Sequence, residues 1–471
     1  MVDTARADAL VLFGATGDLA RKMLFPALYR LAADGQLNVP VIGVAATEWD
    51  DTALARHAGE AVEAAEDTVD AGALSQLQAS LAMVSGDYRE AATFDALARR
   101  LSAIGATRPV HYLAIPPSLF ALTVRQLHTA GLARGARVVV EKPLGRDLAS
   151  AQELNRLLHE VFAESAIFRI DHFLGKEPVE NLLVFRFANS FLEPIWNRRY
   201  IASVQVSLTE DFGVEGRGGF YESVGAIRDV VQNHLLQVVA LLAMEPPVDA
   251  HPDSLRDEKV KVLTATRPAD PDHLVRGQYA GYRDEPGVAT DSTVETYAAL
   301  RLEIDNWRWA GVPFAVRAGK AVSTTALEAI VELHPPPRLL FSPEHCQPHS
   351  NVLRFRLGEH DGVTLSVQAK QPGPQLVSGP VDLDVDFTGV LEPRQRPYQR
   401  LLGDAMAGNP ARFARQNGVE QAWRIIQPLL ERPGPVHPYP RGSWGPAQAD
   451  PVPAGHDGWH DPAPGRATGS S

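Results

Sequence analysis

Short apolar runs alternate with helical patterns between Ala9 and Phe168, and this alternation constrains the fold more than any other feature of the sequence. Each run has the length of a buried strand, and amphipathic helical patterns lie between the runs. The runs predicted to form strands are Ala9–Phe13, Val39–Val44, Leu81–Val84, Val110–Ile115 and Val138–Val140. The helical patterns include Leu19–Leu31, Phe94–Ile104 and Phe120–Leu132. Such an order favours an α/β domain with a parallel, doubly wound sheet.

A turn of small residues joins the first predicted strand to the first predicted helix. It reads Gly14-Ala15-Thr16-Gly17-Asp18-Leu19-Ala20, with Arg21 next. Small residues let a backbone approach a pyrophosphate, and a helix N-terminus offers unpaired N–H groups and a positive dipole end. The spacing varies from the usual dinucleotide fingerprint, and such glycines also serve tight packing. Its place after the first strand of an alternating region favours a dinucleotide-binding Rossmann domain.

The loop after the second strand faces the adenosine ribose in a dinucleotide-binding fold. An arginine there would pair with a 2′-phosphate, whereas an acidic residue would accept a bond from a 2′-hydroxyl. This loop reads Ala45-Ala46-Thr47-Glu48 and contains no arginine. Glu48 is therefore either the acid that accepts a hydrogen bond from the ribose 2′-hydroxyl or a solvated loop charge.

Beyond Phe168 the pattern changes to many strands and few helices. Ile201–Leu208 alternates as a half-buried strand does. A long helical pattern covers Ala226–Ala243, and later strand candidates are Thr296–Ile304, Leu327–Glu332, Val352–Arg356 and Val363–Gln368. We expect a dinucleotide-binding domain over 1–168, an α+β domain with a large antiparallel sheet over 169–445, and a flexible Pro/Gly-rich tail over 446–471.

The bulk properties exclude several classes of protein. A chain of 471 residues is long enough for two domains, and its net charge of −12 argues against nucleic acid and anionic membranes as partners. No apolar stretch approaches the roughly 20 residues of a membrane span, and no signal peptide is visible. Cys346 is the single cysteine, which fits a reducing compartment, so we expect a cytoplasmic protein.

Three further motifs point to a particular protein family. They are Glu141-Lys142-Pro143-Leu144-Gly145, the run from Arg169 to Glu177 (RIDHFLGKE), and Glu215–Gly219 (EGRGG) continuing to Ile227–Gln237 (IRDVVQNHLLQ). Together they resemble the glucose-6-phosphate dehydrogenase family. The similarity continues at Val275–Tyr279, Gly311–Phe314 and Arg317–Lys320, and covers roughly Val11 to Leu430. The resemblance implies oxidation of D-glucose 6-phosphate to its 1,5-lactone with hydride transfer to NAD(P), the first step of the oxidative pentose phosphate pathway.

The resemblance also implies roles for particular residues. His234 would be the catalytic base and Asp171 its carboxylate partner, although spacing alone would make His234 a core histidine beside Ile227, Val231 and Val238. The implied substrate-binding residues are His172, Lys176, Glu210, Asp229, Lys320 and Lys142. The implied coenzyme contacts are Gly14, Ala15, Thr16, Gly17, Asp18, Leu19, Ala20, Arg21, Thr47, Gly86, Asp87, Tyr112 and Lys142. No metal is expected, because hydride transfer needs none.

The sequence departs from the family pattern at positions that bind ligands. Phe173 replaces a phosphate-binding Tyr, Met23 and Thr325 stand where basic residues are usual, and a Gln of the sugar site is missing around Gly358. Ala46 replaces the arginine that reads the 2′-phosphate, so we expect NAD to be used at least comparably to NADP, although the family favours NADP.

Three functions therefore remain open at this stage: an active glucose-6-phosphate dehydrogenase, a non-catalytic paralogue that binds sugar phosphate or dinucleotide, and a dehydrogenase of another sugar phosphate. The family resemblance further implies a homodimer or homotetramer built on the second domain's sheet.

Overall fold

The computed structural model describes residues 6–336, 349–358, 360–388, 394–453 and 458–462, so Cys346 lies outside the described residues. The chain forms two compact units. Unit 1 comprises Met1–Glu177, Pro247–Asp257 and Gln395–Glu420, and unit 2 comprises Pro178–Pro246, Glu258–Arg394 and Gln421–Ser471. A single division after residue 168 does not describe this arrangement, because two later segments return to unit 1.

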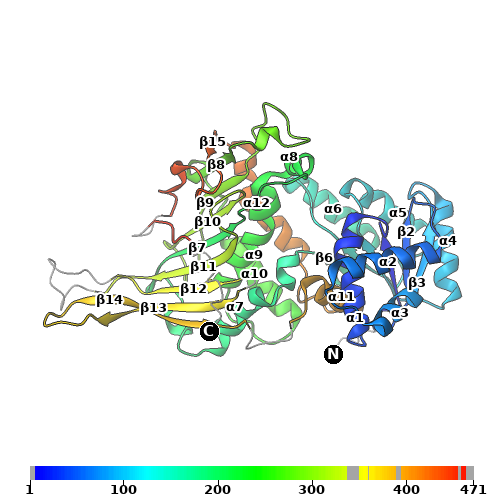
Figure 1. The fold of residues 1–471 in the computed structure, drawn as a ribbon, viewed down its shortest axis with the longest axis horizontal. Helices are drawn as coiled ribbons and strands as arrows, with labels where there is room; N and C mark the ends of the chain where they lie inside the picture. Colours follow the sequence, from blue (N-terminus) through cyan, green and yellow to red (C-terminus); the bar gives the residue numbers. More distant parts are fainter. Residues whose placement is uncertain (1–5, 337–348, 359, 389–393, 454–457, 463–471) are drawn as a thin grey trace. The chain divides into compact units, whose positions relative to one another are not determined.

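Unit 1 contains a six-stranded parallel sheet in the order β3-β2-β1-β4-β5-β6. Figure 1 labels its strands β2, β3 and β6. Its strands are β1 (Ala9–Phe13), β2 (Val41–Ala45), β3 (Leu81–Ser85), β4 (Pro109–Leu113), β5 (Arg137–Val140) and β6 (Ile167–Arg169). The order reverses between β1 and β4, which is the topological switch point where doubly wound sheets bind ligands. The predicted Rossmann-type fold is confirmed, and the first strand begins and ends at the predicted residues.

Helices cover this sheet, and aspartates cap the N-termini of several of them. The helices of this unit are α1 (Phe25–Ala33), α2 (Asp51–Ala65), α3 (Ala71–Ser80), α4 (Ala91–Ala103), α5 (Phe120–Thr129), α6 (Leu148–Val161) and α11 (Pro397–Ala407). Asp50, Asp70 and Asp147 accept backbone N–H groups at the starts of α2, α3 and α6. The late helix α11 packs against α1, and Arg137 donates to the carbonyl of Met406 at 3.1 Å. These contacts explain why residues 395–420 belong to unit 1.

A buried histidine on β4 makes the stability of unit 1 depend on pH. The His111 ring nitrogen Nε2 lies 2.9 Å from the Leu132 carbonyl, and burial lowers the His111 pKa from 6.5 to about 4. The folded state therefore favours the neutral ring, and this stabilisation is present above pH 6.5 and is lost as pH falls toward 4. We expect the free energy of unfolding to lose about 2 kcal/mol from this group between roughly pH 8 and pH 5.

His111→Gln provides the matched comparison, because glutamine keeps a donor for Leu132 and does not titrate. Urea unfolding of both proteins at the two pH values measures the difference. An identical pH dependence in the variant and the parent protein would contradict the assignment.

Unit 2 contains a nine-stranded sheet in the order β14-β13-β12-β11-β7-β10-β9-β8-β15. Its strands are β7 (Ile201–Thr209), β8 (Leu274–Tyr279), β9 (Tyr297–Glu303), β10 (Pro313–Gly319), β11 (Ala326–Leu333), β12 (Val352–Arg356), β13 (Gly362–Lys370), β14 (Ser378–Asp386) and β15 (Val436–Tyr439). The large sheet was predicted, but it is mixed rather than wholly antiparallel. The pairs β7–β10 and β8–β15 are parallel, because the chain returns to the sheet from elsewhere instead of through a hairpin.

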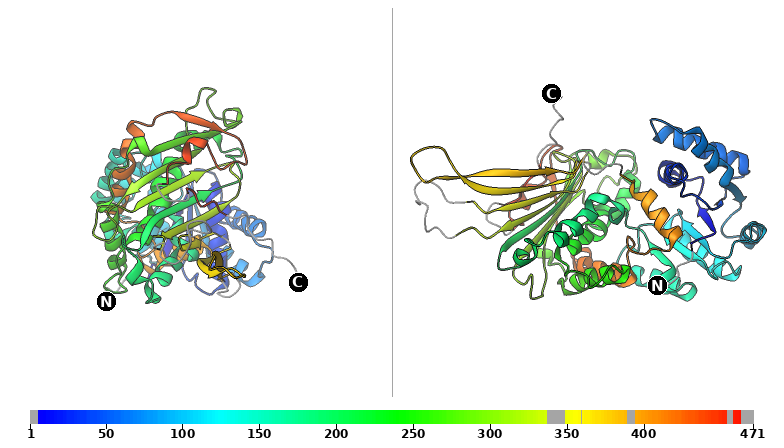
Figure 2. Two further views of the ribbon diagram at one scale, coloured as in Figure 1. Left: turned by 90° about the vertical axis from the view of Figure 1, so that its left-hand side faces the viewer. Right: turned by 90° about the horizontal axis from the view of Figure 1, so that it is seen from below.

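Helical segments line one side of this sheet in the ribbon views (Figure 2). They include α7 (Glu177–Ala188), α8 (Gly218–Ala226), the π-helix η6 (Ile227–Leu235) and α9 (Leu236–Ala243). Every residue of α9 is buried, which matches its nearly continuous apolar sequence. The long β13–β14 hairpin extends beyond the neighbouring strands (Figure 2). Two helices, α10 (Pro252–Ala265) and α12 (Gln416–Glu431), each contribute residues to both units.

The prediction of a flexible tail from residue 446 is wrong for residues 446–453 and 458–462. Ala449 and Val452 belong to a buried apolar cluster of unit 2, and the Trp459 indole donates to the Ala449 carbonyl at 2.8 Å. Asp461 pairs with the buried Arg317 at 2.8 Å. Composition suggested disorder, but the two apolar side chains, the indole and one carboxylate supply enough contacts to fix the segment.

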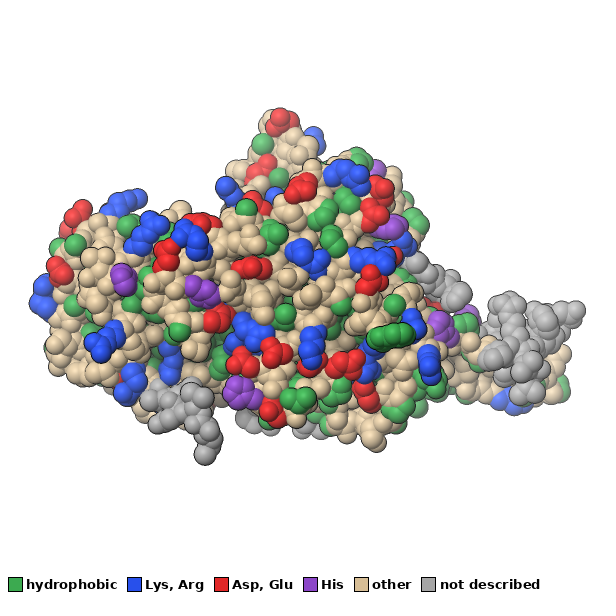
Figure 3. Space-filling view, turned by 180° about the vertical axis from the view of Figure 1, so that it is seen from behind, with side chains coloured by type: hydrophobic (Ala, Val, Ile, Leu, Met, Phe, Trp, Pro, Cys, Tyr) green, Lys and Arg blue, Asp and Glu red, His purple; other side chains and the backbone are tan. Residues whose placement is uncertain are grey.

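Acidic and basic side chains are interspersed on the face shown in Figure 3, which has no large patch of one charge. Among the described residues, no helix combines the length and the apolar character needed to cross a bilayer.

Candidate active site

The turn after β1 takes the shape of a dinucleotide-binding turn because its first residue is glycine. Gly14 has a φ of 83°, and a Cβ at this position would lie 2.2 Å from the Ala114 carbonyl oxygen. The Gly14 N–H reaches both the Val44 carbonyl and the Tyr88 hydroxyl at 2.9 Å. The end of β2 and Tyr88 therefore hold the turn that Ala15, Thr16, Gly17 and Asp18 continue.

A π-helix, η1 (Ala20–Leu24), follows this turn and precedes α1. The sequence predicted an ordinary helix here, because hydrophobic spacing does not distinguish a single wide turn. The π-helix carries Arg21 and Lys22, and the Lys22 ammonium pairs with Asp18 at 3.2 Å in solvent. Short π-helical insertions are often found at functional sites.

The loop after β2 lies beside the turn. The Thr16 and Thr47 hydroxyl oxygens are 3.1 Å apart, so two of the predicted coenzyme residues are brought together. Ala46, Thr47 and Glu48 are all exposed. The loop thus presents one hydroxyl and one carboxylate to any group bound at the turn.

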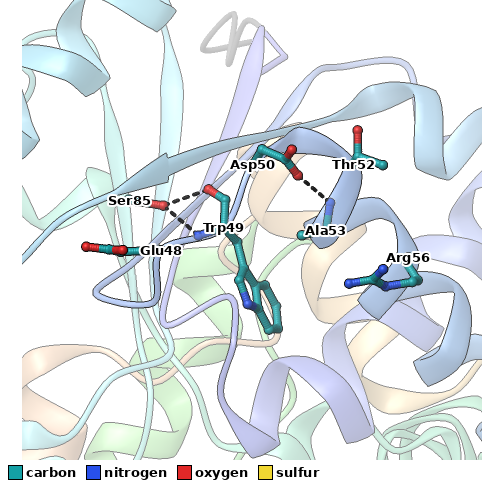
Figure 4. Close-up of a pocket in the computed structure, with 7 residues that line it drawn as sticks. All are labelled: Glu48, Trp49, Asp50, Thr52, Ala53, Arg56 and Ser85. Atoms are coloured by element: carbon teal, nitrogen blue, oxygen red, sulfur yellow. Dashed lines mark hydrogen bonds between the residues drawn. The ribbon is translucent and has the colours of Figure 1, made fainter.

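An open hollow of about 650 Å³ lies next to this loop (Figure 4). It is lined by Glu48, Trp49, Asp50, Thr52, Ala53, Arg56 and Ser85. Ser85 holds Trp49 through two hydrogen bonds, one to its N–H at 3.1 Å and one to its carbonyl at 2.7 Å. In Figure 4, Trp49 lies between Glu48 on one side and Arg56 on the other.

Arg56 was missed by the sequence reasoning, which considered only the loop and not the helix behind it. Its place in the second turn of a helix capped by Asp50 was the available signal. The His57 ring also lies near, 4.9 Å from the Trp49 ring, and burial together with the Arg21 charge lowers the His57 pKa, which favours its neutral form.

Three other predicted coenzyme residues occupy different environments. A Cβ at Gly86 would lie 2.2 Å from the Thr93 hydroxyl, so this position needs glycine for packing. Asp87 is exposed, and the backbone N–H of Arg89 lowers its pKa. Tyr112 is 1% exposed, and its hydroxyl donates to Glu141 at 2.6 Å. Their contact with a dinucleotide stays a prediction.

The Glu-Lys-Pro motif follows β5 and begins with a buried acid. Burial raises the pKa of Glu141, and its carboxylate accepts from Tyr112 and from the Lys142 N–H at 3.3 Å. Lys142 itself is half-buried, and the peptide bond to Pro143 is cis. The fixed glutamate anchors the backbone from which the Lys142 side chain projects.

The segment after β6 presents the next predicted residues on a short 3₁₀ turn, η4 (His172–Gly175). Asp171 is 3% exposed and accepts the Phe173 N–H at 3.0 Å, so it caps the turn. The Lys176 ammonium lies 4.0 Å from the centre of the Phe173 ring. The Phe173 ring therefore makes a cation–π contact with Lys176, although it has no hydroxyl to donate.

Helix α11 supports this segment within unit 1. The His172 ring stacks on Tyr398, with centres 6.4 Å apart and planes at 11°. The Arg400 guanidinium donates to the Gly175 carbonyl at 2.8 Å. Unit 1 thus holds Asp171, His172 and Lys176 on one short, supported turn.

In unit 2, Glu210 and Lys320 follow two neighbouring strands that run parallel. Glu210 comes directly after β7 and Lys320 directly after β10, and their side chains form an ion pair. The Lys320 N–H donates to the Thr296 carbonyl at 3.0 Å, and the Tyr439 hydroxyl donates to the Lys320 carbonyl at 2.6 Å. Both backbone groups of Lys320 are therefore fixed.

Asp229 and His234 lie on the π-helix η6, where the sequence predicted a regular helix. His234 is 3% exposed and Asp229 is half-buried. Burial raises the pKa of Tyr221, and the nearby charges of Asp229, Glu295 and Glu210 raise it further. Because the Lys320 ammonium is 5.3 Å from the Tyr221 ring centre, Tyr221 joins Glu210, Asp229 and Lys320 into one polar group.

The other departures from the family pattern are at Thr325, Met23 and Gly358, and local contacts explain only the first. Thr325, at a position where a cation is usual, donates to the Asp211 carboxylate at 2.5 Å and accepts the Asp211 N–H at 3.0 Å. Met23 is 41% exposed, and a Cβ at Gly358 would meet open space. Nothing in the structure explains the Met23 or Gly358 substitutions.

A dinucleotide turn at a topological switch point, followed by a domain that gathers acids, a lysine and a histidine, defines a two-domain nicotinamide-dependent dehydrogenase. Family models confirm both halves: residues 11–181 match the NAD-binding domain of glucose-6-phosphate dehydrogenase, and residues 183–460 match its C-terminal domain. The chain belongs to the glucose-6-phosphate dehydrogenase family.

Known proteins agree with this assignment over nearly the whole chain. Glucose-6-phosphate 1-dehydrogenase 1 of Mycobacterium tuberculosis is 47% identical over 455 residues, which cover 97% of this chain and 96% of that protein. The crystal structure of the Mycobacterium avium glucose-6-phosphate 1-dehydrogenase matches with a TM-score of 0.89 at 47% identity, covering 97% of this chain and 99% of that one. A glucose-6-phosphate dehydrogenase solved with its substrate glucose 6-phosphate also matches with a TM-score of 0.89, at 35% identity over 96% of this chain and 98% of that chain.

Proposed function

We propose that this protein oxidises D-glucose 6-phosphate to 6-phospho-glucono-1,5-lactone and passes a hydride to a nicotinamide dinucleotide. The observation that carries the proposal is the polar group of unit 2, in which Lys320 pairs with Glu210 and lies 5.3 Å from the Tyr221 ring centre. The Asp229 charge raises the Tyr221 pKa, and Asp229 shares a helix with His234. Carboxylates accept bonds from sugar hydroxyls, and a histidine on the same helix supplies a base. Family membership over residues 11–460 supports the same reaction.

The chemistry assigns distinct roles to the side chains. When bound, the nicotinamide ring accepts a hydride from C1 of the sugar. His234 takes the proton of the C1 hydroxyl, so the C1–H and O–H bonds break as the lactone carbonyl forms. Asp171 is the partner that orients the imidazole and stabilises its protonated form, as the carboxylate of a catalytic triad does.

The substrate phosphate is the part of the ligand that needs cations. His172 and Lys176 supply donors for it, and the cation–π contact with Phe173 keeps Lys176 on the same turn. Lys142 lies between coenzyme and sugar in this proposal, and Lys320 binds the sugar from unit 2. Steady-state assays of NAD and NADP reduction with a panel of sugar phosphates and free sugars test the proposal. Turnover is expected with glucose 6-phosphate, and no turnover with any sugar would favour a non-catalytic binding protein.

We further propose that NAD is used at least comparably to NADP. The hollow beside the ribose loop has two carboxylates, Glu48 and Asp50, and one cation, Arg56. A 2′-phosphate brings about −1.5 to −2 charges and needs a cation to replace its hydration. Ala46 cannot provide one, while Arg21 and Arg56 are the groups that would have to do so.

Ala46→Arg tests this reading of the loop. The arginine fork would pair with the 2′-phosphate, so the ratio of kcat/KM values should shift toward NADP by about tenfold to a hundredfold. Arg56→Gln is the matched variant on the neighbouring helix and should leave the ratio within about threefold. A roughly hundredfold preference of the parent protein for NADP that disappears in Arg56→Gln would contradict NAD competence and make Arg56 the reader of the phosphate.

We also propose a homodimer or homotetramer in the cytosol. Val381, Leu383 and Val385 alternate along β14 and are 47%, 54% and 52% exposed, so they form an apolar row on one face of the sheet. Such a row is suited to burial against a second copy. Light scattering should give a dimer or tetramer mass, and a monomer at assay concentration would contradict the oligomer. Cys346 is the single cysteine of the sequence, which fits a reducing compartment.

A further inference from the structure

The helix η6 carries Asp229 and His234, and a buried glutamate distant in sequence, Glu295, accepts hydrogen bonds from the backbone at its N-terminus. The Ala226 N–H donates to the Glu295 carbonyl at 3.0 Å, and the Ile227 N–H donates to the Glu295 carboxylate oxygen Oε1 at 3.2 Å. Glu295 is only 4% exposed. The first N–H groups of a helix have no partner within it, and a carboxylate there is stabilised by the helix dipole. Glu295 therefore supplies both a backbone and a side-chain acceptor to this helix.

A glycine immediately before the helix permits this close approach. Gly225 has a φ of 65° and a ψ of 176°, which separates α8 from η6. A Cβ at this position would lie 2.5 Å from the Glu295 Oε1 atom. The left-handed backbone and the crowded carboxylate both require glycine, so the direction in which the helix departs is set against Glu295.

A buried arginine fixes the other carboxylate oxygen. Arg276 donates to Glu295 Oε2 from Nε at 3.1 Å and from Nη2 at 2.8 Å, and the side chains are 8% and 5% exposed. The same guanidinium donates to the carbonyls of Thr293 and Gly434 at 2.7 and 3.0 Å. Both Arg276 bonds end on Oε2, while Oε1 accepts the Ile227 N–H, so each carboxylate oxygen has its own partner. Glu295 therefore cannot rotate without losing its bonds to Arg276.

The next residue connects the same segment to the substrate lysine. Thr296 follows Glu295 and accepts the Lys320 N–H at 3.0 Å through its carbonyl. The two consecutive residues Glu295 and Thr296 thus contact the start of the His234 helix and the backbone of Lys320. A shift of this segment would displace the base and the substrate lysine together.

We propose that Glu295, held by Arg276, is a positioning residue for the oxidation: it sets the place of Asp229 and His234 through the first turn of their helix. The inference rests on the proposed function, since it assigns no chemistry to Glu295 itself. Misplacement of a reacting group by about 1 Å can cost roughly a hundredfold in rate. Glu295 therefore acts on kcat through the helix and not through contact with the sugar or the coenzyme.

The test compares Glu295→Ala with Glu328→Ala. Glu328 is the matched control, because it is also a nearly buried carboxylate of unit 2 in an ion pair, with Arg354, and is remote in sequence from the helix. We expect Glu295→Ala to lower kcat by about tenfold to a hundredfold with little change in the dissociation constant for the dinucleotide. Glu328→Ala should lower the melting temperature without lowering kcat below about half.

Equal effects of the two alanine variants on kcat would overturn the proposal. Glu295→Gln covers the case in which Glu295→Ala does not fold, because an amide oxygen can still accept the Ile227 N–H while Arg276 loses its anionic partner. It should lower kcat by about threefold to tenfold, and an unchanged kcat would overturn the proposal. An inactive parent protein would instead refute the proposed function and would be seen before any variant is measured.

Discussion

His234→Asn is expected to abolish turnover while glucose 6-phosphate still binds. Asparagine retains polar atoms but cannot take a proton at working pH, so the change removes a group that acts in the transition state rather than in the bound complex. Loss of a general base typically costs about 10²–10⁴-fold in rate, and the loss should appear in kcat with little change in substrate affinity. Initial-rate kinetics and calorimetric titration with glucose 6-phosphate measure the two quantities.

The surface residue His251 provides the control for this substitution. It is exposed, and His251→Asn should retain the rate of the parent protein. If His234→Asn kept a near-parental kcat, His234 would be a buried structural histidine and the base would have to be another residue. A variant that lost substrate binding together with turnover would point to a ligand-binding role.

Lys176→Ala is expected to impair the use of glucose 6-phosphate far more than the use of unphosphorylated glucose. The reason is that, in the proposed function, Lys176 supplies a charged donor to the phosphate, which unphosphorylated glucose lacks. Loss of a bond to a charged group costs about 1.5–3 kcal/mol, which corresponds to roughly tenfold to 150-fold in kcat/KM. Phe173, on the same short turn, has no hydroxyl that could replace the lost donor.

Lys261→Ala serves as the control for lysine removal, since the Lys261 side chain is 69% exposed and its partner, the buried Glu258, lies on the same helix α10. It should leave the rates with both sugars unchanged. Equal losses with glucose and glucose 6-phosphate in Lys176→Ala would show that Lys176 serves catalysis or folding and not phosphate recognition.

Much of unit 1 could be predicted from sequence, because its parallel strands are short, apolar and separated by helices. Strand β1 occupies the predicted residues, and the turn at Gly14 follows it as expected. The returning segments 247–257 and 395–420 could not be predicted, because helical periodicity gives no information about which unit a helix packs on. The contacts of the described residues after 446 could not be predicted, because a composition rich in proline and glycine is typical of flexible segments.

Motifs predict which residues form the site, but they do not predict the contacts that hold those residues in place. Periodicity does not separate a π-helix from an α-helix, so the wide turns at Arg21 and His234 were not anticipated. Contacts between residues distant in sequence, such as Glu295 with Ile227, leave no local signal. The same holds for Arg56, whose relevance depends on the hollow beside Trp49.

Transfer of deuterium from C1 of the sugar tests the central claim most directly. Glucose 6-phosphate labelled with deuterium at C1 is incubated with the protein and oxidised coenzyme, and the reduced coenzyme is analysed by mass spectrometry. The proposed reaction moves the C1 hydrogen as a hydride, so the deuterium should appear on the nicotinamide ring, and His234→Asn should suppress its appearance. Reduced coenzyme without the label, or no reduced coenzyme at all, would contradict the proposal that this chain oxidises C1 of glucose 6-phosphate.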